Sequence, residues 1–118
     1  MTVGVYRIFN VKNNKSYVGQ SLDIDRRLHE HYRALNSLTV SHHSPKLQED
    51  WDEYGPDAFE AEILEVCPED KLEEREKYWI YFFDSATNGY NVRNCYNKAI
   101  KDELNKAIAL LNNLKERI

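Results

Sequence analysis

The sequence predicts an α+β fold, in which a small three-stranded antiparallel sheet is flanked by helices. Two segments near the N-terminus show the two-residue periodicity of strands, and several later segments show the periodicity of helices. Strands and helices do not alternate as they do in parallel α/β proteins. A chain of 118 residues has the length of one ordinary domain.

The N-terminal segment is expected to form a hairpin. Residues 3–10 alternate between two faces, one of which carries Tyr6 and Ile8. Residues 12–15 favour a tight turn, and residues 16–20 resume the alternation. The two strands should therefore pair antiparallel.

Two helices are expected next. The first begins with Asp23 or Asp25 as its N-cap and ends near Asn36. The second follows Ser44-Pro45, a capping residue with proline at the first helical position, and ends at Gly55.

The third strand is expected at residues 58–66, and a third long helix from Pro68 to Phe83. Asn88-Gly89 marks a turn. The last 21 residues carry a heptad stripe, which would form a helix that packs on its own domain or pairs with a partner, including a second copy of the chain.

The chain is expected to divide into a main domain at 1–96 and this helix at 97–118. No apolar run approaches the ~20 residues of a membrane span, and no signal-peptide pattern is found. The two cysteines, Cys67 and Cys95, show neither a zinc pattern nor a disulfide framework. These features predict a cytoplasmic protein.

Glu76 breaks the pattern of its helix, because it falls within a stripe formed by Leu72, Trp79 and Ile80. A carboxylate among apolar side chains is costly unless it is paired, hydrogen-bonded or bound to a metal. A structural ion pair with an arginine and a functional role both explain this position.

His31 lies in the apolar stripe of the first helix, with Arg27 one turn earlier on its flank. A satisfied core histidine and an Arg–His site are the two interpretations. His42-His43 precedes the next helix, beside its positive end. Adjacent histidines are a weak metal signal, and no third ligand is spaced to complete a zinc site.

Two strand tyrosines lie close to glycines, in Gly4-Val5-Tyr6 and Tyr17-Val18-Gly19. Either tyrosine alone is typical of core packing with a hydrogen-bonded hydroxyl. A glycine on the same strand lets a ligand or another backbone approach closely.

Taken in order, these motifs resemble those of the GIY-YIG nuclease family over residues 3–93, with valine in place of both isoleucines. The resemblance is greatest to the catalytic domains of phage and intron homing endonucleases, because His42 precedes a Lys-Leu-Gln helix. The site residues that the resemblance implies are Tyr6, Tyr17, Arg27, His31, His42, Glu76 and Asn91.

The family implies metal-dependent hydrolysis of a DNA phosphodiester at a single active site, in a bacterial or phage-infected host cell. Glu76 would hold one Mg²⁺ or Mn²⁺, and Arg27 would stabilise charge on the phosphate. Tyr6 or Tyr17 would deprotonate or position the attacking water, with help from His31. Asn91 would brace the site, and His43 is a candidate equal to His42 for the last position.

The charge pattern bears on the substrate. The net charge is −4, but residues 1–50 carry +2 and residues 51–118 carry −6. We therefore expect duplex or branched DNA to be held weakly. A non-catalytic nucleic-acid-binding or protein-interaction module that retains the nuclease fold is the alternative function.

Overall fold

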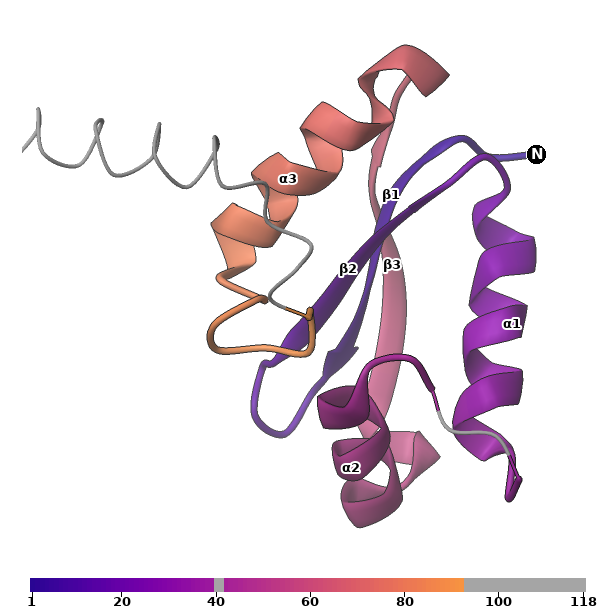
Figure 1. Ribbon diagram of the computed structural model, residues 1–118, viewed down its shortest axis with the longest axis vertical. Helices are drawn as coiled ribbons and strands as arrows, with labels where there is room; N and C mark the ends of the chain where they lie inside the picture. The colour runs from indigo at the N-terminus through magenta and orange to yellow at the C-terminus, as the bar shows by residue number, and fades with distance from the viewer. Residues whose placement is uncertain (40–41, 93–118) are drawn as a thin grey trace, which may run out of the picture.

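The N-terminal hairpin and one later strand form the sheet. The computed structural model describes residues 1–39 and 42–92, and in it β1 spans Gly4–Asn10, β2 Ser16–Ser21 and β3 Phe59–Val66. The strand order is β2-β1-β3, and both pairings are antiparallel (Figure 1). The predicted α+β class is confirmed.

Helices cover both faces of the sheet (Figure 1). The α-helices are α1 at Ile24–Asn36, α2 at Pro45–Tyr54 and α3 at Leu72–Phe83, and the short 3-10 helices are η1 at Pro56–Ala58 and η2 at Glu69–Lys71. Helices α1 and α2 lie on one side of the sheet and α3 on the other. Among the described residues, no helix is long and apolar enough to cross a membrane.

The alternation of β1 divides the core into two layers. Tyr6 and Ile8 face α1 and α2, where they pack with buried Leu47 and Trp51. Val5 faces α3 and belongs to a second cluster with Val18, Ile80 and Ala86. The predicted assignment of faces is confirmed, because a two-residue period sends neighbouring side chains to opposite layers.

The helix ends follow the predicted capping residues, with one difference. Asp23 is the N-cap of α1, and Ser44 caps α2 with Pro45 at its first turn. The helix predicted from Pro68 instead begins at Leu72, after η2. Pro68 has ψ of 154°, an extended conformation, so it precedes the helical backbone.

The turn after α3 returns the chain to the start of β2. The Tyr90 N–H donates to the Ser16 carbonyl at 2.9 Å, and the Asn91 N–H donates to the Ser85 carbonyl at 2.9 Å. A Cβ at Gly89 would overlap the backbone of Ser16 and of Ser85, so the close approach of these segments requires glycine here. The helix predicted at 97–118 lies outside the described residues, as do residues 93–96 of the predicted main domain.

We expect Leu47→Ala to lower the free energy of unfolding by about 3 kcal/mol, because it leaves a cavity between α2 and the sheet. Leu47 is fully buried, whereas Leu38 is fully exposed. Leu38→Ala is therefore the matched control, with an expected change within about 0.5 kcal/mol. Urea unfolding measures both values, and equal losses would contradict the packing described.

Candidate functional site

Tyr6 is placed by the register of the hairpin. It lies opposite Gly19 in the β1–β2 pairing, and a Cβ at Gly19 would overlap its phenol ring. A register shift relative to β3 occurs between Val5 and Tyr6. The Tyr6 side chain is 1% exposed. Gly19 therefore leaves the space that the phenol occupies, so a side chain approaches this glycine where the sequence predicted a ligand or another backbone.

Helix α1 presents His31 and Arg27 to the tyrosines. His31 is buried in the apolar stripe of the helix, and its Nε2 lies 2.6 Å from the Tyr6 hydroxyl. Arg27 stays on the flank and pairs with Glu30 at 2.8 Å. Burial alone would lower the pKa of Arg27, but Glu30 and the two tyrosines outweigh it and raise the pKa. Arg27 thus holds its positive charge beside both phenols.

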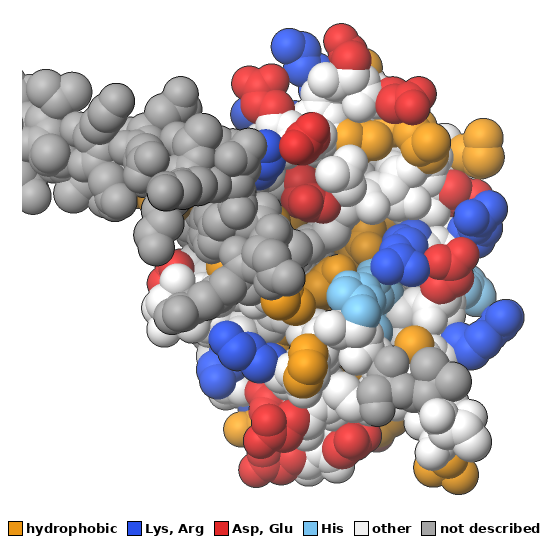
Figure 2. Space-filling view, in the orientation of Figure 1, with side chains coloured by type: hydrophobic (Ala, Val, Ile, Leu, Met, Phe, Trp, Pro, Cys, Tyr) orange, Lys and Arg blue, Asp and Glu red, His pale blue; other side chains and the backbone are white. Residues whose placement is uncertain are grey.

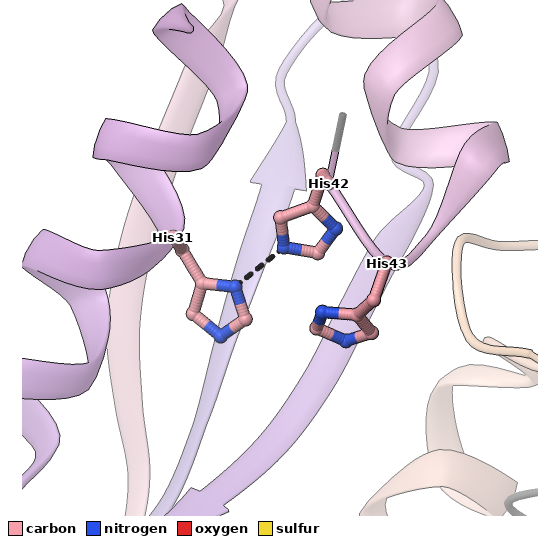
Figure 3. A group of neighbouring side chains, drawn as sticks. All are labelled: His31, His42 and His43. Atoms are coloured by element: carbon pink, nitrogen blue, oxygen red, sulfur yellow. Dashed lines mark hydrogen bonds between the residues drawn. The ribbon is translucent and has the colours of Figure 1, made fainter. Parts of the chain in front are cut away.

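His42 and His43 enter the site from the segment before α2, and Figure 3 shows their rings beside His31. His42 is buried, and its Nε2 lies 2.5 Å from His31 Nδ1. His43 is exposed, and its Nε2 lies 2.6 Å from the Tyr17 hydroxyl. Both histidines therefore contact the predicted site, each through a different neighbour.

The hydrogen bonds fix the proton positions on two of these rings. The Ser44 backbone N–H donates to His42 Nδ1 at 2.9 Å, so in the neutral ring the proton is on Nε2. His42 Nε2–H then donates to His31 Nδ1, which places the His31 proton on Nε2. His31 Nε2–H in turn donates to the oxygen of Tyr6. A chain of donors runs from Ser44 to Tyr6.

Both buried imidazoles are neutral at pH 7. Burial, together with the nearby Arg27 charge, lowers the pKa of His31 to about 3. Burial likewise lowers the pKa of His42 to about 4. Burial raises the pKa of Tyr6, while the Arg27 charge acts in the opposite direction. The phenol is therefore protonated at rest, in a setting where Arg27 and His31 favour its anion.

The three histidines also have the composition of a metal site, since each offers a nitrogen within 4.8 Å of the others. Sequence spacing indicated no third ligand beside His42 and His43, and the fold supplies a third nitrogen by bringing His31 from α1. A ligating nitrogen must present its lone pair, however, and His42 Nε2 carries its proton. Moving this proton to Nδ1 would set it against the Ser44 N–H. The hydrogen-bonded chain accounts for the positions of His31 and His42, and the contact with Tyr17 accounts for His43.

Glu76 lies on α3 beside the end of β2. It is half-buried, and Gln20 is its hydrogen-bond partner through both side chain and backbone. Burial raises the pKa of its carboxyl, and Gln20 opposes this rise. Within residues 1–39 and 42–92 Glu76 forms no ion pair, so the structural ion-pair interpretation is wrong for the described part of the chain.

A neighbouring residue of α3 makes that ion pair instead. Arg75 binds both carboxylate oxygens of Glu65, at 2.8 and 2.9 Å. The Glu76 carboxylate, in contrast, is close enough to Tyr6 to raise its pKa. A half-buried carboxylate that forms no ion pair within the described residues fits a divalent cation that keeps several waters.

Asn91 braces the edge of the sheet next to the tyrosines. Its Oδ1 accepts from the Val18 N–H at 2.8 Å, and its Nδ2 donates to the Val18 carbonyl at 2.9 Å. Val18 separates Tyr17 from Gly19 in β2. Ser44 Oγ donates to the Tyr90 carbonyl, which ties the start of α2 to the same turn.

The fold thus gathers the predicted residues into one electrostatic neighbourhood. Tyr6 interacts electrostatically with Tyr17, Arg27 and Glu76. Its hydroxyl is hydrogen-bonded to His31, which is hydrogen-bonded to His42. Asn91 contributes by holding the backbone of β2 through its two hydrogen bonds to Val18. The sequence interpretation missed the second role of Ser44, which it treated as a helix cap alone, and the partner of His43. Figure 2 shows histidine side chains reaching the surface beside Lys and Arg side chains.

Comparisons with known proteins agree with this geometry. Residues 2–91 match the model of the GIY-YIG catalytic domain. The Intron-associated endonuclease 1 of Enterobacteria phage T4 is 37% identical over 114 residues, which cover 90% of this chain and 45% of that protein. The chain therefore spans about half the length of the curated relative that it matches.

Two solved structures share the fold. One is the catalytic domain of homing endonuclease I-TevI, with a TM-score of 0.71 and 39% identity, covering 76% of this chain and 97% of that one. The other is a point variant of the same domain, with the same TM-score and identity, covering 78% and 94%. GIY-YIG nucleases are generally metal-dependent. By its motifs, its sheet and these matches, the chain belongs to the GIY-YIG family.

Proposed function

We propose that this chain is the catalytic module of a homing-type or stand-alone DNA endonuclease, which hydrolyses phosphodiester bonds at a single metal-dependent site. The observation that carries the proposal is the electrostatic interaction of one phenol, Tyr6, with Tyr17, Arg27 and Glu76. The family and the relatives named above support an endonuclease acting on DNA.

Glu76 is the proposed ligand of one Mg²⁺ or Mn²⁺. Its oxygen suits a hard cation, and it forms no ion pair with the described lysines and arginines, so a bound cation would relieve the burial of its charge. When bound, the ion supplies positive charge to the substrate phosphate and lowers the pKa of water. The carboxylate reaches the site from α3, opposite the helix that carries Arg27.

Arg27 is the proposed electrostatic partner of the scissile phosphate. The planar guanidinium offers paired N–H groups that match phosphate oxygens. Its pairing with Glu30 leaves the side chain 37% exposed, so a substrate can reach it. The same charge favours the anions of Tyr6 and Tyr17, which increases the fraction of phenolate available to accept a proton from an attacking water.

His31 and His42 are proposed to prepare Tyr6 for this reaction. The donor chain from Ser44 delivers the His31 Nε2–H to the phenol oxygen, which stabilises a phenolate by a charge-assisted hydrogen bond. Because both rings are neutral, they donate without adding a competing positive charge. Asn91 keeps β2, and with it Tyr17, in position.

DNA is the proposed substrate, and the chain should bind it weakly on its own. The half of the chain that contains Tyr6, Tyr17 and Arg27 carries a net charge of only +2, and the other half is acidic. Few phosphate contacts give modest affinity that falls with salt.

We expect Glu76→Gln to lower the rate of Mg²⁺-dependent plasmid cleavage by about 100-fold, because the amide keeps the shape but cannot hold the cation. Glu74→Gln, on an exposed part of the same helix, is the matched control and should cleave as the parent does. EDTA should abolish cleavage by the parent chain. Undiminished cleavage by Glu76→Gln would exclude this residue as the metal ligand.

We expect Arg27→Lys to slow single-turnover cleavage by about 100-fold, since lysine keeps the charge but loses the planar fork. Arg26 is 78% exposed on the same helix and shares the Glu30 partner. Arg26→Lys should change the rate by less than about twofold. If both variants lost activity equally, the loss would reflect general DNA attraction.

A further inference from the structure

The two tyrosines of the site face imidazoles in different states. Tyr6 receives the Nε2–H of His31, and this order is fixed from the Ser44 backbone through His42. His31 therefore has no vacant nitrogen facing Tyr6 and cannot accept its proton without reversing the whole chain. The Tyr6 oxygen therefore accepts a hydrogen bond from His31, and His31 cannot carry the Tyr6 proton away.

Tyr17 has a different partner. Its hydroxyl lies 2.6 Å from His43 Nε2, and within residues 1–39 and 42–92 no backbone N–H fixes the tautomer of the His43 ring. His31 and His42 are 1% and 4% exposed, whereas His43 is exposed to solvent. The His43 ring can present a lone pair at Nε2 while its Nδ1 exchanges with water.

Packing holds the His43 ring in this position. It stacks on His42 with ring centroids 4.2 Å apart and an interplanar angle of 28°, and it meets the Tyr17 ring edge-on at 5.5 Å. The ring therefore stays beside the hydroxyl although its position is exposed. His42 is in turn fixed by Ser44 and His31.

We propose that His43 is a positioning residue of the site, which orients the Tyr17 hydroxyl and carries its proton to and from solvent. This inference rests on the proposed nuclease function. The Tyr17 O–H bond breaks and the proton bonds to His43 Nε2, which leaves a phenolate and an imidazolium. The imidazolium then releases its Nδ1 proton to water, and the reverse steps restore the phenol.

The surrounding charges favour a short-lived transfer of the Tyr17 proton to His43. Arg27 acts electrostatically on Tyr17 and favours its phenolate. Burial, together with the same Arg27 charge, lowers the pKa of His43, so the imidazolium gives up its proton readily. Tyr17 is thus the phenol of the pair whose protonation can be reset from solvent during turnover.

The test is single-turnover cleavage of plasmid DNA with Mg²⁺ by the full chain. We expect His43→Ala to slow cleavage by about tenfold, the loss typical of one active hydrogen bond. Imidazole added to the buffer should restore the rate, because the position is open to solvent. His29→Ala, which removes an exposed histidine of α1, is the control and should retain the parent rate without imidazole.

Double variants identify the partner. In a Tyr17→Phe chain, His43→Ala should cause no further loss, whereas in a Tyr6→Phe chain it should keep its full effect. The proposal is overturned if His43→Ala cleaves like the parent chain, or if its effect persists undiminished without the Tyr17 hydroxyl. If added imidazole did not restore the cleavage rate of His43→Ala, the proposal that His43 carries the Tyr17 proton would be overturned.

A second readout is independent of cleavage. In ¹H–¹⁵N spectra of the imidazole rings, Tyr17→Phe should shift the His43 Nε2 resonance and leave His29 unchanged. If the parent chain cleaved no DNA, the nuclease proposal would fail while this hydrogen bond could still be observed. An unchanged His43 resonance would overturn the contact with Tyr17 on which this inference depends.

Discussion

The pairing of Tyr6 with Gly19 across β1 and β2 is the constraint on which the site depends. The phenol lies over the glycine, in space that a Cβ would fill. A shift of the register by one residue would send Tyr6 to the α3 layer and away from His31. The same pairing also places Tyr17 and Gln20, the hydrogen-bond partner of Glu76. The register of one hairpin therefore positions both tyrosines and Gln20.

Ser44 connects the remaining elements to this hairpin. It caps α2, its hydroxyl binds the Tyr90 carbonyl, and its backbone N–H sets the tautomer of His42. Two segments that are distant in sequence, the start of α2 and the turn at Tyr90, therefore meet at one fully buried residue. Because hydrogen bonds in a buried setting are strong and costly to break, this junction keeps the histidine rings in a fixed proton order.

The two charged side chains of the site come from helices on opposite faces of the sheet. Arg27 on α1 brings positive charge to the tyrosines, and Glu76 on α3 brings a half-buried carboxylate. Arg75, which precedes Glu76 in the helix, pairs with Glu65 and so does not neutralise Glu76. An arginine, and a carboxylate that forms no ion pair within the described residues, lie near the phenols in an arrangement suited to a phosphate and a cation together.

The sequence by itself determined the strands and helices, the division of β1 into two faces, and the unusual position of Glu76, because local periodicity and capping act over a few residues. It also supplied the motifs of the family.

Tertiary structure alone decided which imidazole serves which tyrosine. His42 and His43 are adjacent in the chain and indistinguishable by pattern, yet one is buried against His31 and the other is exposed against Tyr17. It also excluded an ion pair for Glu76 within the described residues. These outcomes depend on contacts between distant segments, which no local spacing encodes.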